Sequence, residues 1–292
     1  MKEIVIISGK GGTGKTTLAL ALAQLMDQTI LADCDVDAAD MHLVLQPDVR
    51  METPFSGGRA AEILKDRCTA CGICRNVCAY DAISPDFFVD PYGCEGCGAC
   101  VVFCPEDAIR FEPEINGTVY HSESRFGPFY HARLNPGSEN SGKLVTRVRN
   151  DARARAIADQ ASFILSDGSP GVGCPVVASI TGADYAVVVT EPTVSGAHDL
   201  ERVLSLLEHF DVPGGVVVNK FDLRPEMGHN IAERARGRGM DDLGYLPFDV
   251  DPVIGAMNAC RTVLEHDPSA PISQAIHQVH HRLLAAIRTK SI

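Results

Sequence analysis

Cysteine is the residue type that first suggests chemistry in this chain. Eight of the eleven cysteines form two runs with one spacing, Cys-x2-Cys-x2-Cys-x3-Cys. A cubane iron–sulfur cluster needs four thiolates, and in such runs the first three cysteines bind one cluster while the fourth binds the other. The sequence therefore predicts two [4Fe-4S] centres. The expected ligands are Cys68, Cys71, Cys74 and Cys104 for the first, and Cys94, Cys97, Cys100 and Cys78 for the second.

Zinc sites and disulfides are the alternatives for these cysteines. Structural zinc sites use paired Cys-x2-Cys knuckles with a long spacer, and disulfides need an oxidising compartment. A triple run that is repeated with identical spacing fits neither pattern well. The runs resemble those of the bacterial two-cluster ferredoxins, since Pro105 follows Cys104 as expected. The first run departs from that pattern, because Ala79 stands where proline would follow Cys78.

A glycine-rich loop near the N-terminus predicts a phosphate-binding site. Its glycines also satisfy the G-x-G-x-x-G dinucleotide fingerprint, with Asp33 about 20 residues further on. Lys15 and Thr16 favour the P-loop instead, in which backbone N–H groups cradle the phosphates, the lysine reaches the β and γ oxygens and the hydroxyl binds Mg²⁺. The residues expected to bind the nucleotide here are Gly9, Gly11, Gly12, Thr13, Gly14, Lys15, Thr16 and Thr17.

Apolar strand-like runs alternate with helical stretches along most of the chain. This rhythm predicts an α/β fold, with a mostly parallel sheet flanked by helices. The expected strands are Glu3–Ser8, Thr29–Asp35, Phe163–Gly168, Asp184–Thr190, Gly215–Asn219 and Leu243–Pro247.

The cysteine-rich segment interrupts this rhythm and is predicted to be an inserted domain. It contains an internal duplication, because each cysteine run is followed by Asp-Ala-Ile, at 81–83 and at 107–109. We expect a small α+β ferredoxin-like domain over 60–112, inside an ATPase domain made of 1–59 and 113–292. Residues 113–150 are rich in Gly, Ser, Asn and Pro, and are read as a hairpin-containing connector.

Lys10 gives the loop the form KGGTGKT. This deviant Walker A sequence resembles the MinD, ParA, Mrp and nitrogenase iron protein superfamily. The resemblance implies ATP as ligand, and it implies that Lys10 reaches across a nucleotide-sandwich dimer to the partner's phosphates. An ATP-dependent homodimer, or a heterodimer with a related ATPase, is therefore expected. The alternative is a solvated loop lysine, because a Walker A loop works without it.

Acidic residues at strand ends complete the expected nucleotide site. The resemblance implies that Asp35 orients the attacking water and that Asp33 is an outer partner of Mg²⁺, which Thr16 and Asp167 also hold. Asn219 and Asp222 resemble the base-reading segment of these ATPases, although Asn-Lys-x-Asp also matches the guanine-specific motif of GTPases. The catalytic residues expected from this comparison are Lys10, Lys15 and Asp35.

Composition restricts the partners. A formal net charge of −12 disfavours a non-specific nucleic-acid binder. No apolar run approaches the length of a membrane span, and the sequence opens without a signal-peptide pattern, so we expect a cytoplasmic protein. An apolar stripe near the C-terminus is predicted to be the core face of a helix rather than a membrane-binding face. The stripe consists of Ile272, Ile276, Val279, Leu283 and Ile287.

Three cysteines lie outside the runs. Asp167 and Cys174 have the spacing D-x6-C, by which the nitrogenase iron protein links its switch II aspartate to a cluster ligand at the dimer interface. Cys174 is therefore either an interface thiolate or a small packed residue. Cys34 and Cys260 are interpreted as structural, because free cysteine packs well in cores.

Three functions follow from these features. The leading one is a slow, partner-stimulated ATPase that couples a nucleotide-dependent dimer switch to electron transfer between redox proteins, through two [4Fe-4S] clusters. The second is an Mrp-like carrier or assembly ATPase for iron–sulfur clusters, although the C-terminal Cys-x-x-Cys of Mrp is absent. The third is a positioning switch of the MinD/ParA type whose clusters sense redox state.

Overall fold

The computed structural model describes residues 1–138 and 142–289. The chain divides into two compact units. Unit 1 comprises Met1–Glu52, Val119–Arg133 and Asn140–Ile292, and unit 2 comprises Thr53–Thr118 and Leu134–Glu139. Unit 2 is thus wider than the segment 60–112 expected from the cysteine spacing, and it takes a second stretch of chain from the segment that was read as a connector.

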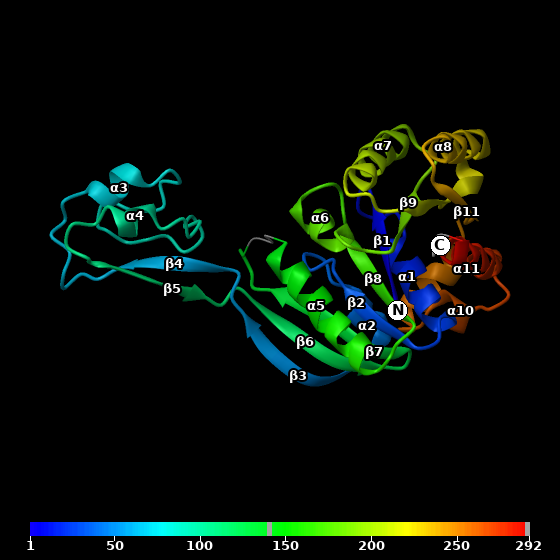
Figure 1. Ribbon diagram of the computed structural model, residues 1–292, viewed down its shortest axis with the longest axis horizontal. Coiled ribbons are helices and arrows are strands. Elements are labelled where there is room, and N and C mark those ends of the chain that lie inside the picture. The colour runs from blue at the N-terminus through cyan, green and yellow to red at the C-terminus, as the bar shows by residue number, and fades with distance from the viewer. Residues whose placement is uncertain (139–141, 290–292) are drawn as a thin grey trace. The chain divides into compact units, whose positions relative to one another are not determined.

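A nine-stranded sheet organises unit 1, with the strand order β11-β10-β9-β1-β8-β2-β7-β6-β3 (Figure 1). From β11 to β7 the neighbouring strands are parallel. The sheet confirms the predicted mostly parallel α/β fold. Its strands are β1 (Lys2–Ser8), β2 (Thr29–Asp33), β3 (Asp48–Phe55), β6 (Gly117–Ser124), β7 (Gly127–Leu134), β8 (Phe163–Pro170), β9 (Tyr185–Thr190), β10 (Gly214–Val218) and β11 (Asp241–Tyr245).

Helices cover both faces of this sheet, which explains the continuous apolar runs in its central strands. Along β1, Ile4 and Ile6 face one core, whereas Val5 and Ile7 face the other. The first core is closed by α1 (Lys15–Leu25), α2 (Met41–Leu45), α9 (Val250–Asn258), α10 (Val263–His266) and α11 (Pro271–Thr289). The second is closed by α6 (Cys174–Ile180), α7 (Val194–His209) and α8 (Pro225–Gly237), with α5 (Lys143–Ala158) packed beside α6.

Helix α11 buries the stripe that was expected to face the core. All five residues of the stripe belong to the first core, and none exposes more than 7% of its surface. The prediction of a core face for this helix is therefore confirmed. Among the residues that the structure describes, no helix combines the length and apolar character needed to cross a bilayer.

The segment 113–150 contributes directly to the main sheet. Strands β6 and β7 form a hairpin, and β7 pairs with β2 in parallel through Leu31 and Ala32. Strand β3 at the sheet edge was not predicted. It is polar and largely exposed, with the sequence DVRMETPF. Pairing with neighbouring strands outweighs weak local β-propensity at such positions.

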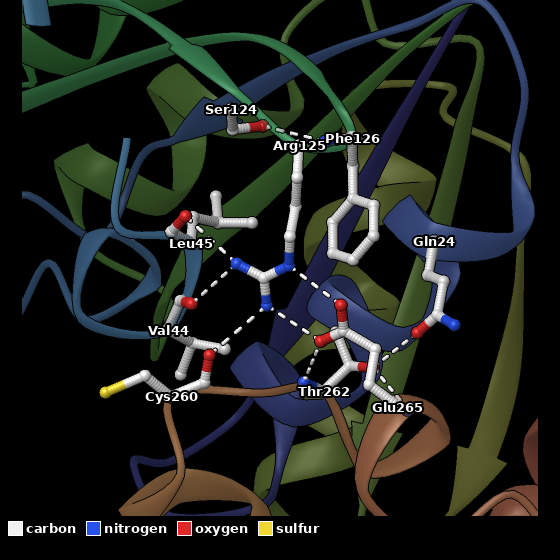
Figure 2. A network of polar contacts seen from close by, with 9 residues as sticks. All are labelled: Gln24, Val44, Leu45, Ser124, Arg125, Phe126, Cys260, Thr262 and Glu265. Carbon is white, nitrogen blue, oxygen red and sulfur yellow. Dashed lines mark hydrogen bonds and ion pairs between the residues drawn. The ribbon is translucent and has the colours of Figure 1, made fainter. Parts of the chain in front are cut away.

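Arg125, in the turn between β6 and β7, fixes this hairpin to two helices (Figure 2). Its guanidinium donates to the Val44 and Leu45 carbonyls at the end of α2, at 2.9 and 3.0 Å. It also binds both carboxylate oxygens of Glu265 in α10, at 2.8 Å each. A planar guanidinium suits this fork-shaped recognition. The arginine thereby satisfies helix-end carbonyls that have no partner within α2.

Unit 2 is a small α+β structure. Strands β4 (Gly58–Ile63) and β5 (Ile109–Glu114) pair antiparallel, with Gly58 opposite Glu114 and Ile63 opposite Ile109. Two short helices, α3 (Ile73–Val77) and α4 (Ala99–Val102), lie in the chain between these strands. The small core of unit 2 combines aliphatic side chains with the cysteines of both runs.

A buried histidine in β7 predicts a pH dependence of stability. His131 stacks between Tyr120, Phe129 and His42, and burial together with the charge of His42 lowers its pKa from 6.5 to about 4. The unfolded chain then binds the proton more readily than the folded protein does. Between pH 6.5 and about 4 this residue should therefore remove about 3 kcal/mol from the free energy of unfolding.

Urea unfolding of the wild type and of His131→Phe at several pH values measures this effect. The substitution keeps an aromatic ring but removes the titrating group, so its stability should fall less on acidification. His281→Gln, on the exposed side of α11, should retain the wild-type slope. If the free energy of unfolding depended on pH equally in the wild type and in His131→Phe, His131 would not be the source of this pH dependence.

Candidate functional site

The P-loop joins the end of β1 to the start of α1. Gly14 adopts a left-handed conformation with φ 93° immediately before Lys15, the first residue of the helix. A Cβ at Gly14 would lie 2.4 Å from Nδ2 of Asn219, and one at Gly9 would lie 2.4 Å from Cβ of Asp199. A Cβ at Gly11 or Gly12 would meet no atom within 4 Å. The loop is thus packed from behind and open on one side, as a phosphate cradle must be.

Lys15 and Asp35 form the first charged pair of the site. The lysine Nζ lies 3.7 Å from Oδ2 of Asp35, and the two side chains are only 5% and 11% exposed. Burial raises the pKa of Asp35, while the charge of Lys15 opposes this shift. A polyphosphate bound in the loop would offer Lys15 a stronger anionic partner and leave the carboxylate available to a water molecule.

Strand register brings two further carboxylates together. Asp33 ends β2 and lies directly opposite Asp167 of β8, and both are at most 1% exposed. Asp33 accepts hydrogen bonds from the backbone N–H groups of Asp35 and Met41, at 3.1 and 3.2 Å. Burial, and then the charge of Asp167, raises the pKa of Asp33 well above its usual range. Burial likewise raises the pKa of Asp167 to about 7, against the effects of Lys15 and Thr16.

Thr16 and Asp167 form the part of the site that fits Mg²⁺. The Thr16 hydroxyl donates to Oδ2 of Asp167 at 2.6 Å. The other carboxylate oxygen of Asp167 is buried with no hydrogen-bond partner, as is the hydroxyl of Thr13. Unpaired buried oxygens are costly, and a hydrated cation satisfies them. The oxygen ligands present are those that Mg²⁺ prefers.

A cavity of about 270 Å³ adjoins the loop. Its lining combines Gly12, Gly14 and Thr17 with Asn219, Lys220 and apolar side chains of α9 and α11. Asn219 donates from Nδ2 to the Thr13 carbonyl at 2.8 Å, so it also supports the loop. Asp222 is not part of the lining. Its carboxylate accepts from the backbone N–H of Phe248 at 2.7 Å and thus shapes the loop that covers the cavity.

Lys10 is not a free loop lysine in this structure. Its Nζ lies 3.1 Å from Oε2 of Glu191 and 3.4 Å from the hydroxyl of Ser195. Glu191 also forms an ion pair with Lys220, which follows Asn219. Glu191 was not predicted to be a site residue. Its only local signal was its position directly after an apolar strand, which is also how Asp33 and Asp167 were found.

The eight cysteines of the two runs line two hollows in unit 2. One hollow is lined by Cys68, Cys71, Cys74 and Cys104 together with apolar side chains that include Ile63 and Ile109. The other is lined by Cys78, Cys94, Cys97 and Cys100 with Ile83 and Phe111. Each hollow therefore takes three cysteines from one run and the fourth from the other run.

The backbone around these hollows repeats itself. Left-handed conformations occur at Ala70, Gly72 and Asp81, with φ 56°, 81° and 50°. They recur at Gly96, Gly98 and Asp107, with φ 61°, 74° and 46°. Gly72 and Gly98 each precede a short helix. The duplication visible in the sequence is thus also a duplication of backbone geometry, including one left-handed aspartate in each half.

The surroundings of the sulfurs fit a cluster bound by thiolates. The backbone N–H of Ala108 donates to Sγ of Cys104 at 3.4 Å. Cys74 and Cys100 are buried among aliphatic side chains. Hydrogen bonds to sulfur and restricted solvent access are what tune such clusters. Within residues 1–138 and 142–289, no three histidine, cysteine or carboxylate side chains form a group that could hold a single metal ion.

The remaining cysteines lie in unit 1, in different environments. Cys34 is fully buried, which agrees with a packing role, and burial raises the pKa of its thiol beyond the usual range. Cys260 is half-buried and accepts a hydrogen bond from Arg125 through its carbonyl. Cys174 is exposed at the start of α6. The alternative that Cys174 is a small packed residue is therefore wrong, and its role as an interface thiolate stays a prediction.

Fold and loop geometry together define a P-loop nucleoside triphosphatase. Residues 4–254 match the CobQ/CobB/MinD/ParA nucleotide binding domain family. The chain belongs to this family and is a P-loop ATPase of the MinD/ParA type.

Relatives and solved structures agree with this assignment. An uncharacterized protein of Methanocaldococcus jannaschii, MJ0578, is 32% identical over 96% of both chains. The septum site-determining protein MinD of Synechocystis is 25% identical over 92% of this chain and 84% of its own. The cell division ATPase MinD of Pyrococcus furiosus shares the fold, with a TM-score of 0.59 at 17% identity over 98% and 99% of the two chains.

The Thr16 hydroxyl gives the most direct test of the proposed metal site. Thr16→Ala should raise the Mg²⁺ concentration that half-saturates ATP turnover by about 10- to 100-fold, because a metal-orienting oxygen is lost. Thr16→Ser keeps the hydroxyl and should stay near the wild type. Steady-state turnover at saturating ATP, titrated with Mg²⁺, measures the effect. An unchanged Mg²⁺ dependence in Thr16→Ala would remove Thr16 from the proposed metal site.

Proposed function

We propose that this protein hydrolyses ATP with Mg²⁺ and couples the cycle of an ATP-dependent dimer to electron transfer through two [4Fe-4S] clusters. The observation that carries the proposal is the division of the eight cysteines between two hollows. Each hollow is lined by four cysteines, of which three come from one run and the fourth from the other. This crossed arrangement is the one that two-cluster ferredoxins use. When bound, such clusters supply one-electron chemistry at low potential.

In the ATPase unit, hydrolysis needs positioning and charge neutralisation more than covalent chemistry. Lys15 is buried at the helix start, where its charge offsets that of the β and γ phosphates. Asp35 lies beside it and would orient the attacking water. Asp167 and Thr16 would hold Mg²⁺, with Asp33 as the outer carboxylate. Lys10 would reach the nucleotide of the partner subunit when the dimer closes.

The cavity beside the loop supports adenine as the base. Its walls are largely apolar, and Asn219 is its amide-bearing residue. The carboxylate of Asp222 is already bonded to the Phe248 N–H, whereas guanine recognition by an Asn-Lys-x-Asp motif needs that carboxylate at the base. We therefore favour ATP over GTP.

A short chain path leads from the ATPase site to the cysteine-rich unit. Asp33 holds the N–H of Met41 at the start of α2, and Arg125 holds the carbonyls at its end. Strand β3 begins at Asp48 and continues into unit 2. A change at Asp33 on nucleotide binding would be transmitted along α2 to the strand that enters unit 2. The inserted ferredoxin-like domain, residues 60–112 by sequence, is the proposed recipient of that change.

A positioning switch is the second candidate, because named relatives include MinD septum site-determining proteins. In that case the clusters would sense redox state, and the nucleotide would control recruitment to a partner or surface. Redox proteins as electron donor and acceptor are expected only for the leading proposal. Cycling of electrons without loss of iron distinguishes electron transfer from both sensing and cluster delivery.

Selective loss of one cluster tests the cysteine assignment. Cys71→Ser and Cys97→Ser should each halve the iron content of about eight atoms per chain and remove a different cluster signal in electron paramagnetic resonance. Lys15→Ala should abolish ATP hydrolysis but retain both clusters. Cys174→Ser, outside both hollows, should retain all the iron. Full iron in Cys71→Ser, or zinc in place of iron in the anaerobically purified wild type, would contradict the proposal.

A further inference from the structure

Glu191 occupies a position that the parallel sheet makes special. Strand β9 lies between β1 and β10, so the residue after its end lies between the loops that follow those two strands. The loop after β1 carries Lys10, and the loop after β10 carries Lys220. Both ammonium groups contact the same carboxylate, Lys10 through Oε2 and Lys220 through Oε1.

Glu191 is more deeply buried than its two lysine partners, and its backbone is packed against the start of α7. Glu191 exposes 10% of its side chain, against 35% for Lys10 and 29% for Lys220. Its carbonyl accepts from Thr193 N–H at 2.8 Å, and Thr193 caps α7 by accepting from Gly196 N–H at 2.9 Å. A Cβ on Gly196 would lie 2.4 Å from that carbonyl, so the helix end packs closely against Glu191.

One carboxylate shared by two lysines leaves an excess of one positive charge at the open edge of the phosphate loop. Burial acts to raise the pKa of Glu191, but hydrogen bonds and charge from Lys220 and Lys10 outweigh it, and the pKa is lowered. Glu191 is therefore ionised at neutral pH and competes with phosphate oxygens for Lys10. Partly buried ion pairs of this kind are screened less by salt than exposed ones.

We propose that Glu191 is a positioning residue that holds Lys10 within its own subunit until nucleotide is bound, and that Lys220 weakens this hold by sharing the carboxylate. This role of Glu191 rests on the proposed ATP-dependent dimer. It adds a restraint on Lys10 that acts before the dimer forms. Because Lys220 lines the base cavity, occupancy of that cavity alters how much of the carboxylate remains for Lys10.

Two variants should shift dimer formation in opposite directions. Glu191→Gln keeps the shape but removes the charge, so Lys10 is released and the ATP concentration for half-maximal dimer should fall at least about five-fold. Lys220→Met removes the competing cation, so Glu191 holds Lys10 more tightly and that concentration should rise. Light scattering with Mg-ATP measures the dimer, and calorimetry with Mg-ADP separates any change in nucleotide affinity.

Glu201→Gln is the matched control, because Glu201 lies on α7, the helix that follows Glu191 in the chain, and pairs with Arg234 and Arg238 instead. It should leave the dimer midpoint unchanged. A second readout needs no ATP: acetylation of Lys10, followed by mass spectrometry, should be several-fold faster in Glu191→Gln than in the wild type.

Two outcomes would overturn the inference while leaving the proposed function intact. One is a wild type that dimerises with ATP and a Glu191→Gln variant with the same midpoint or a higher one. The other is unchanged Lys10 reactivity in Glu191→Gln. A wild type that neither dimerises nor hydrolyses ATP would overturn the proposed function, and the restraint with it.

Discussion

The pairing of β2 with β8 is the constraint on which the nucleotide site depends. Its register sets Asp33 against Asp167 at the carboxyl edge of the sheet, where both are almost completely buried. Burial raises the pKa of both carboxylates, and the charge of Asp167 raises that of Asp33 further. Lys15 and a cation are the partners that can relieve this repulsion. The strand register therefore creates a need for positive charge at this edge of the sheet. The P-loop supplies the remaining contacts.

The same carboxylate edge connects the site to the rest of unit 1. Asp33 binds the start of α2, and Arg125 binds its end, so this short helix is anchored at both termini. Ligand-dependent changes in such proteins usually arise where a packed element has two discrete positions. Helix α2 is suited to this role because few residues separate it from β3, which runs on into unit 2.

Much of this fold could be predicted from the sequence, because buried parallel strands have continuous apolar runs and the P-loop has a fixed sequence requirement. Strand β3 was not predicted, and the hairpin expected within 113–150 was not predicted to join the main sheet, since the residues of these strands are mixed and several of their pairing partners lie far away in the chain. Arg125 and Glu191 were missed for a related reason. An isolated arginine or glutamate has no motif, and its importance arises only when distant segments meet around it.

The redox dependence of ATP turnover tests most directly whether the two units act together. Turnover would be measured anaerobically with the protein oxidised and then reduced with dithionite, with electron paramagnetic resonance reporting the cluster state. The account predicts a several-fold difference in rate between the two states that disappears in Lys10→Ala. Equal rates in both states would contradict coupling and would leave the cysteine-rich unit as cargo or scaffold.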